Sequence, residues 1–186
     1  MNADPNAAPF GGTWDTEASV DATKEDMPPM YTGAGTGDDF DKAMQAKSEA
    51  SDLKAQGLYE EALVKFNDAI VLADPSALLL ANRAHVLFKL GKYSVAIRDC
   101  DAALDKNPDS AKALRIRGEC HLKRSKYHDA LKDLSAAQTI DFDEEAATML
   151  KEATEKCKEL DAVEVKKKLE EEEKLKKRAA EVRETC

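Results

Sequence analysis

The sequence has few of the residues that mark secreted, membrane-spanning or disulfide-bonded proteins. Only 5% of its 186 residues are aromatic, and it contains four cysteines and three histidines. No apolar run approaches the roughly 20 residues that a membrane-spanning helix needs, and the N-terminus lacks the basic start and apolar core of a signal peptide. We therefore expect a cytoplasmic protein.

The cysteines do not form a metal-binding or redox motif. They lie at Cys100, Cys120, Cys157 and Cys186, with no CxxC pair and none of the density of a disulfide framework. We expect all of them to be free thiols.

Positive charge is scarce overall. The chain holds 28 Lys and Arg against 37 Asp and Glu, a net charge of −9, which argues against a general nucleic-acid binder. The excess acid lies at the ends, because residues 1–40 hold eight acids and one lysine and residues 143–186 hold fourteen acids and eleven bases. The middle of the chain is therefore close to neutral.

Catalytic and cofactor motifs are missing. His85, His121 and His128 fall on three different expected helices, and none is part of a recognised nucleophile or zinc motif. Neither GxGxxG nor GxxxxGK[ST] occurs, so the sequence gives no support for a phosphate site. We predict no catalytic residue, no metal and no cofactor, and therefore a protein that is not an enzyme.

The first 38 residues form a segment of distinct composition. They include "PFGGTWDTE" and "DMPPMYTGAGTGDD", which are rich in Gly, Pro, Asp and Thr. Such a composition buries too little apolar surface to fold alone, so we predict a disordered acidic arm over 1–38. The alternative is a short docking segment around Phe10 and Trp14.

What the sequence does contain is a repeat of 34 residues. The stretches "GLYEEAL" at 57, "GKYSVAI" at 91 and "SKYHDAL" at 125 are in step, with tyrosines at 59, 93 and 127. Each unit carries two apolar helical patterns around a turn, which indicates a helical hairpin. We predict helices over 40–56, 59–72, 75–90, 93–106, 109–124 and 127–139. Pro75 and Pro108 fall at hairpin starts, where a ring without an N–H is tolerated in the first helical turn.

Small residues recur where two helices of a hairpin would cross closely. Ala50, Ala84 and Gly118 are expected to face Ala62, Ala96 and Ala130. This pattern resembles the tetratricopeptide repeat family, whose large second-helix position is filled here by Phe66, Cys100 and Leu134. Only Pro108 fills the family's closing proline position. The resemblance implies an all-α, right-handed solenoid of three repeats over 40–142 (about 42–74, 76–108 and 110–142).

A further helix should cover the end of the stack. Ala146, Met149, Leu150, Ala153, Cys157 and Leu160 form one apolar stripe, and Asp143 is a plausible N-cap. We predict a capping helix over 143–164. Residues 165–186 are nearly all charged, with Glu and Lys or Arg spaced to meet across helical turns, and we expect them to extend it as a solvated helix.

The family resemblance also points to a binding surface. In stacked hairpins the first helix of each repeat lines a concave groove, and the residues expected to be exposed there are mainly basic. We predict that they bind a partner. The alternative is that these long basic side chains only keep the surface soluble. The predicted groove residues are Lys47, Ser51, Lys54, Asn82, His85, Lys89, Lys112, Arg115 and Lys123, with Ile116 and Glu119 beside them.

Some domains of this family bind chaperone tails that end in Glu-Glu-Val-Asp, through a clamp of Lys, Asn, Asn, Lys and Arg. The resemblance places these positions at Lys47, Ser51, Asn82, Lys112 and Ile116. Three of the five match. Ile116 cannot supply the charge or the forked donors that an arginine gives a carboxylate.

A narrower resemblance is to the Hip (Hsc-seventy-interacting protein) family, over about residues 42–180. It rests on "AIRDCD", "NPDSA", an Arg-Gly pair, and "DFDEE" leading into "MLKE" and a charged helix. The family grips the ATPase domain of the heat-shock seventy chaperone and is implied to hold its ADP state. Its N-terminal dimerisation segment and Gly-Gly-Met-Pro repeats are missing here.

The resemblances imply a non-enzymatic co-chaperone that binds the ATPase domain of the heat-shock seventy chaperone through the groove and the adjacent helix. One alternative is a receptor for Glu-Glu-Val-Asp tails. Another is a general scaffold or the repeat half of a thioredoxin fusion, since this sequence could be a fragment of a longer chain.

Overall fold

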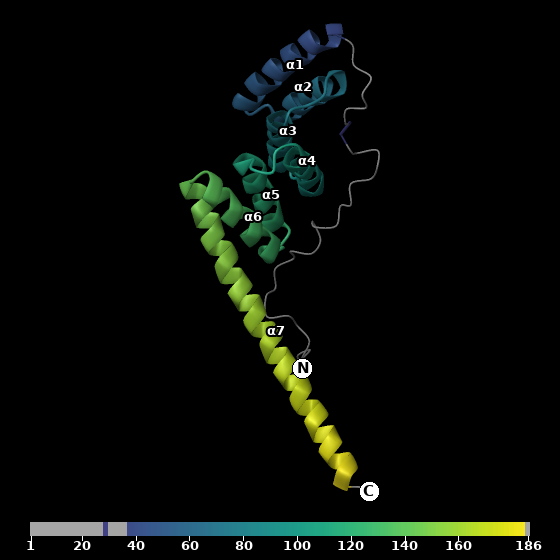
Figure 1. Ribbon diagram of the computed structural model, residues 1–186, viewed down its shortest axis with the longest axis vertical. Helices are drawn as coiled ribbons and strands as arrows, with labels where there is room; N and C mark the ends of the chain where they lie inside the picture. The colour runs from purple at the N-terminus through teal and green to yellow at the C-terminus, as the bar shows by residue number, and fades with distance from the viewer. Residues whose placement is uncertain (1–27, 30–36, 185–186) are drawn as a thin grey trace, which may run out of the picture.

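The computed structural model describes residues 28–29 and 37–184, and every regular element in these ranges is an α-helix (Figure 1). The all-α prediction is confirmed. Most of the predicted arm, including Phe10 and Trp14, lies outside the described residues. The elements are α1 (Gly37–Ala55), α2 (Tyr59–Leu72), α3 (Ala77–Lys89), α4 (Tyr93–Lys106), α5 (Ala111–Lys123), α6 (Tyr127–Ile140) and α7 (Glu144–Glu184).

The first six helices form three hairpins stacked in chain order. Helices α1 and α2, α3 and α4, and α5 and α6 pack as pairs, each second helix also packs on the helix that follows it, and α3 packs on α5 as well (Figure 1). Each hairpin turn has a left-handed residue two positions after the last residue of the first helix. Gly57 and Gly91 have φ of +79° and +75°, and Ser125 takes the same place with φ of 56°.

Serine caps set where the later hairpins begin. The hydroxyl of Ser76 accepts from the Leu79 backbone N–H at 3.2 Å, and that of Ser110 accepts from Ala113 at 3.4 Å. Pro75 and Pro108 therefore precede the helices. The predicted helix start at Pro75 was wrong, because α3 begins at Ala77. The caps satisfy N–H groups that would otherwise lack a partner, so the helix begins after the serine.

The hairpins cross where one helix has almost no side chain. Ala50, Ala84 and Gly118 are buried, as are Ala62, Ala96 and Ala130 on the second helices. The closest approach is at Gly118, where an added Cβ would lie 2.8 Å from Cγ and 3.0 Å from Cδ2 of Leu134. Gly118 therefore packs directly against the large second-helix residue.

Ion pairs repeat with the same period as the hairpins. Arg83 on α3 donates from Nε and Nη2 to Asp99 on α4 at 2.6 and 3.0 Å, and both side chains are fully buried. Thirty-four residues later, Arg117 donates to Asp133 at 2.7 Å from both Nε and Nη2. The first hairpin has the charges exchanged, with Glu49 on α1 paired to Lys65 on α2 at 2.7 Å. Each hairpin is thus joined by one pair between its two helices.

Helix α7 is one continuous helix that leaves the stack (Figure 1). Asp143 caps it, because its Oδ1 accepts from the Ala146 N–H at 2.8 Å. The helix packs on α6 and buries Ala146, Ala153 and Cys157, whereas Leu160 of the predicted stripe is exposed. From Lys158 to Glu181 every side chain is exposed, and pairs such as Lys168–Glu164 at 2.6 Å support this solvated part.

The contact between Gly118 and Leu134 can be tested by the effect of Gly118→Ala on the free energy of unfolding, which should have opposite signs in the native chain and in a Leu134→Ala background. In the native chain, Gly118→Ala should lower the free energy of unfolding by about 1 kcal/mol, because overpacking outweighs the gain in helix propensity. In a Leu134→Ala background the same change should instead raise that free energy by about 1 kcal/mol. Urea unfolding of the four chains measures both effects. An effect of the same sign in both backgrounds would contradict the close contact.

Candidate functional site

The centre of the predicted surface is the amide of Asn82 on α3. Its Oδ1 accepts from Lys54 Nζ of α1 at 3.1 Å and from Lys112 Nζ of α5 at 2.5 Å, so three first helices meet at one oxygen. Asn82 is only 9% exposed, which fixes the amide between the two ammonium groups. We call the set Lys54, Asn82, His85, Lys89, Lys112 and Arg115 the cationic cluster.

The imidazole of His85 lies within the field of these cations. Burial is the main cause that lowers the pKa of His85 to about 4, and the charges of Lys54, Lys89, Lys112 and Arg115 account for the rest of this shift. Its buried Nδ1 has no hydrogen-bond partner among the described residues. The ring is therefore neutral at pH 7.

Lys112 is the most strongly perturbed lysine of the cluster. Burial, together with the neighbouring charges of Lys54 and Arg115, lowers its pKa to about 8. A bound anion would stabilise the ammonium form and raise this pKa again. The positive charges of the cluster are therefore only partly compensated by nearby acids.

One edge of the cluster is neutralised from within the chain. Arg115 Nη1 donates to Asp143 Oδ2, while Oδ1 of the same carboxylate caps α7. The backbone of Asp143 is held in turn by the side chain of Gln138, which donates to its carbonyl oxygen and accepts from its N–H. The start of α7 is thus part of the site.

Glu119 adds a second acid at this edge. Burial raises its pKa, Arg115 and Lys89 oppose that rise, and Glu145 and Asp143 reinforce it. The sequence had predicted Asp143 only as a cap. Its place beside α5 follows from the order of the hairpins, because α7 starts directly after α6 and α6 pairs with α5.

The other predicted residues are less closely involved. Ser51 donates its hydroxyl to the carbonyl of Lys47 in the previous turn at 2.9 Å, so this donor is already used. Lys89 is exposed, with Nζ 5.6 Å from the centroid of the Phe88 ring. Lys47 is half-buried on α1 and Lys123 is exposed in the last turn of α5.

Ile116 does not line the surface, and the expectation that it is exposed was wrong. Its side chain is 2% exposed and belongs to the central apolar core. Lys112 and Ile116 lie one turn apart on the same side of α5, but Lys112 is half-buried whereas the apolar Ile116 side chain packs into the core. The position that a tail clamp fills with arginine is therefore closed here.

Other kinds of site find no support in the described part of the chain. Residues 28–29 and 37–184 contain no group of three His, Cys, Asp or Glu placed to hold a metal ion. Cys100, Cys120 and Cys157 are free and buried, and burial raises the pKa of the Cys120 thiol to about 12. None of the helices described is both long and apolar enough to cross a membrane.

Comparisons with known proteins agree with this architecture. Residues 81–147 match a family model described as tetratricopeptide repeat. The TPR repeat-containing thioredoxin TDX of Arabidopsis thaliana is 35% identical over 149 residues, which is 79% of this chain and 39% of that protein. Hsc70-interacting protein 1 of Drosophila melanogaster is 32% identical over 147 residues, which is 78% of this chain and 39% of that protein.

A solved structure is also similar. It is the first TPR of Spaghetti (RPAP3) bound to the HSP90 peptide SRMEEVD, with 27% identity and a TM-score of 0.60 over 62% of this chain and 93% of that one. The matched region thus covers nearly all of a chaperone-peptide-binding repeat domain. It spans only about two fifths of each of the two sequence relatives.

The environment of His85 predicts an acid-dependent loss of stability. Because its native pKa of about 4 lies below the ordinary value of 6.5, the unfolded chain binds a proton first as the pH falls. The free energy of unfolding should therefore decrease between pH 6.5 and about 4. His85→Gln should reduce this loss by on the order of 1 kcal/mol, a value discounted for partial exposure of the ring.

Urea unfolding at pH 7 and pH 4.5 measures the difference. His128→Gln is the matched control, because His128 is exposed. An equal acid sensitivity in His85→Gln and the native chain would show that the pKa of His85 is not lowered in the folded protein.

Proposed function

The chain contains a tetratricopeptide repeat domain with homology to Hsc70-interacting proteins, and from that relationship we propose that it is a non-enzymatic co-chaperone adaptor. Its partner is a heat-shock seventy chaperone, contacted on the ATPase domain in a way that favours the ADP state. We place this activity in the cytoplasm. The single observation that carries the proposal is the cationic cluster, in which Lys54 and Lys112 meet at Asn82.

The electrostatics support an acidic protein surface as the ligand. On a chain of net charge −9 the cluster gathers four cations around one neutral histidine. Acidic groups on a partner would relieve the repulsion among these cations. A partner with a basic surface would be repelled. Lys47 and Lys123 lie on the same helices and would extend the contact.

The start of α7 supports a contact wider than a peptide tail. Arg115 joins the cluster to Asp143 at the α7 N-cap. A partner that covers Lys112 and Arg115 would therefore also reach the first turn of α7. Such a contact suits the side of a folded domain.

The tail-receptor alternative has support from the peptide complex of the similar structure. In this chain the clamp is incomplete, because Ile116 is buried and the Ser51 hydroxyl is already donated to Lys47. Lys47, Asn82 and Lys112 remain. We therefore place the ATPase-domain contact first and the tail contact second.

The thioredoxin alternative rests on the Arabidopsis relative, whose name includes both a repeat region and thioredoxin. It concerns what the repeat domain would be joined to. It does not conflict with chaperone binding by the repeats.

The cluster can be tested by removing charge while keeping the lysine stems. Lys54→Met with Lys112→Met should weaken binding to the isolated ATPase domain on the order of tenfold at low salt, because two cations facing acid are lost. Lys132→Met with Lys151→Met removes the same charge from exposed sites on α6 and α7 and should change affinity less than about twofold. Calorimetry gives both constants.

The same calorimeter separates the two chaperone hypotheses. Binding of the peptide SRMEEVD that is lost when its terminal carboxylate is amidated, with no binding to the ATPase domain, would favour the tail receptor. Equal loss in both double variants would contradict a role for the cluster.

Asp143 should act as an internal competitor for Arg115. Asp143→Asn keeps a side chain that can cap α7 but removes the charge that pairs with Arg115. Affinity for the acidic partner should rise about threefold to tenfold, which corresponds to a change of roughly 1 kcal/mol in the binding free energy. Asp141→Asn, at an exposed residue of the same junction, is the control in the same titration. An unchanged or reduced affinity in Asp143→Asn would exclude competition.

A further inference from the structure

Two arginines on neighbouring helices share one carboxylate away from the cationic cluster. Asp99 Oδ1 accepts from Arg83 Nη2 and from Arg98 Nη2, both at 3.0 Å, and Oδ2 accepts from Arg83 Nε at 2.6 Å. Arg83 and Asp99 are fully buried, and Arg98 is 28% exposed. Two positive charges thus meet one negative charge between α3 and α4.

Arg117 of the third hairpin is the equivalent of Arg83, and its guanidinium is paired with two carboxylates. There Arg117 pairs with Asp133 and also donates from Nη1 to Asp101 at 2.6 Å. The residue 34 places before Asp101 is Asn67, a neutral amide that accepts from Arg83 Nη1 at 3.0 Å. Among the described residues, the Arg83 guanidinium therefore has a neutral amide from the preceding hairpin where the Arg117 guanidinium has a carboxylate.

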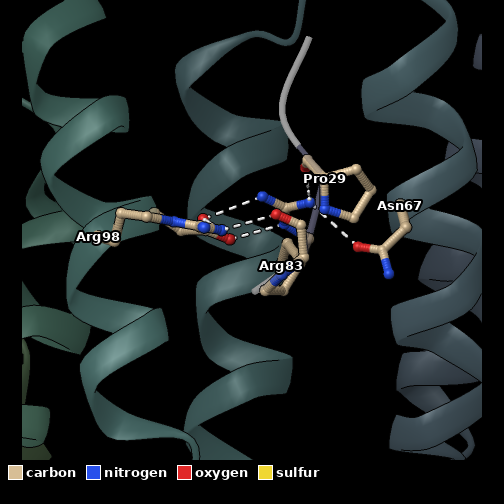
Figure 2. Close-up of polar contacts among 6 residues, drawn as sticks. Pro29, Asn67, Arg83 and Arg98 are labelled. Atoms are coloured by element: carbon tan, nitrogen blue, oxygen red, sulfur yellow. Dashed lines mark hydrogen bonds and ion pairs between the residues drawn. The ribbon is translucent and has the colours of Figure 1, made fainter. Parts of the chain in front are cut away.

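Backbone oxygens of a distant segment take the place of the missing acid. Arg83 Nη1 donates to the carbonyl of Pro29 at 2.7 Å, and Arg98 Nη2 donates to the carbonyl of Pro28 at 3.2 Å. Figure 2 shows Pro29 above the Arg83 guanidinium, with Asn67 and Arg98 on either side. Pro28 is buried.

Two consecutive prolines suit such a site. They have no N–H to satisfy, their φ is fixed, and an extended proline segment offers its carbonyls without an internal hydrogen bond. Ordering the segment therefore costs less entropy than ordering a flexible one. A pocket of about 410 Å³ lies next to it, lined by Pro29, Asn67, Val71 and Leu72 among others.

We propose that Asn67, Arg83, Arg98 and Asp99 form a second peptide-binding site, which recognises the carbonyls of an extended Pro-Pro segment. Its resident ligand is this chain's own Pro28–Pro29. The site uses the side of α3 that faces α2 and α4, whereas the cationic cluster joins α3 to α1 and α5. The proposal is independent of chaperone binding.

Competition between the tethered segment and a free peptide tests it. The probe is a fluorescent, end-blocked peptide of residues 25–32, EDMPPMYT, titrated against the full chain by anisotropy. A tethered segment has a millimolar effective concentration, so the native chain should bind the probe weakly. The Pro28→Gly, Pro29→Gly variant should bind it at least fivefold more tightly.

Two matched changes locate the binding. Pro5→Gly with Pro9→Gly alters two other prolines of the N-terminal region and should leave affinity at the native level. Adding Arg98→Gln to the Pro28→Gly, Pro29→Gly variant should reduce its affinity for the probe at least threefold, without touching the buried Arg83.

Three results would overturn the proposal. They are equal binding of the probe by the native chain and the Pro28→Gly, Pro29→Gly variant, no binding by either, and an affinity of the variant that does not respond to Arg98→Gln. Thermal unfolding of the same chains gives a second readout. The midpoint should fall in the Pro28→Gly, Pro29→Gly variant relative to the Pro5→Gly, Pro9→Gly control, and equal midpoints would also contradict a resident segment.

Discussion

The close crossing of the two helices in each hairpin is the constraint on which the rest of the structure depends. Ala50, Ala84 and Gly118 allow second helices to lie directly against first helices. This spacing brings α3 against α5 and lets side chains of α1, α3 and α5 reach one another at Asn82. A bulkier residue at these places would spread the hairpins and separate the lysines. The charge distribution of the candidate site is therefore a consequence of where side chains are absent.

The two polar regions of α3 treat charge in opposite ways. On one side Arg83 is buried with a carboxylate, an amide and a carbonyl, so its charge is compensated within the chain. On the other side burial, together with repulsion among the neighbouring cations, lowers the pKa of Lys112 and of His85. Buried charge needs partners to be tolerated, whereas half-exposed charge can remain available to a ligand. One helix thus holds a compensated region and an uncompensated one.

Much of this arrangement could be predicted from local patterns in the sequence. The 34-residue step predicted the hairpins, and the capping role of Asp143 was predicted from its position before an apolar stripe. The burial of Ile116 was missed because neighbouring positions on a helix differ by about 100°, so a small error in register exchanges core for surface. The pairs Arg83–Asp99 and Arg117–Asp133 do repeat at 34 and could have been found. The contact of Pro28 and Pro29 could not, because it joins residues 54 and 70 positions apart with no period to reveal it.

The exchanged charges of the first hairpin also make it a poor substitute for the third hairpin. Arg117 meets Asp101 of the hairpin before it, in addition to Asp133 of its own. The first hairpin has Glu49 at the position of Arg117. If that hairpin followed the second one, its glutamate would lie against Asp101 and the two acids would repel each other. Repeat proteins are prone to misassembly by exchange of similar units between chains. The charge pattern makes the three units non-equivalent, so that a copy of the first hairpin exchanged into the third place would meet repulsion from Asp101 that the native order avoids.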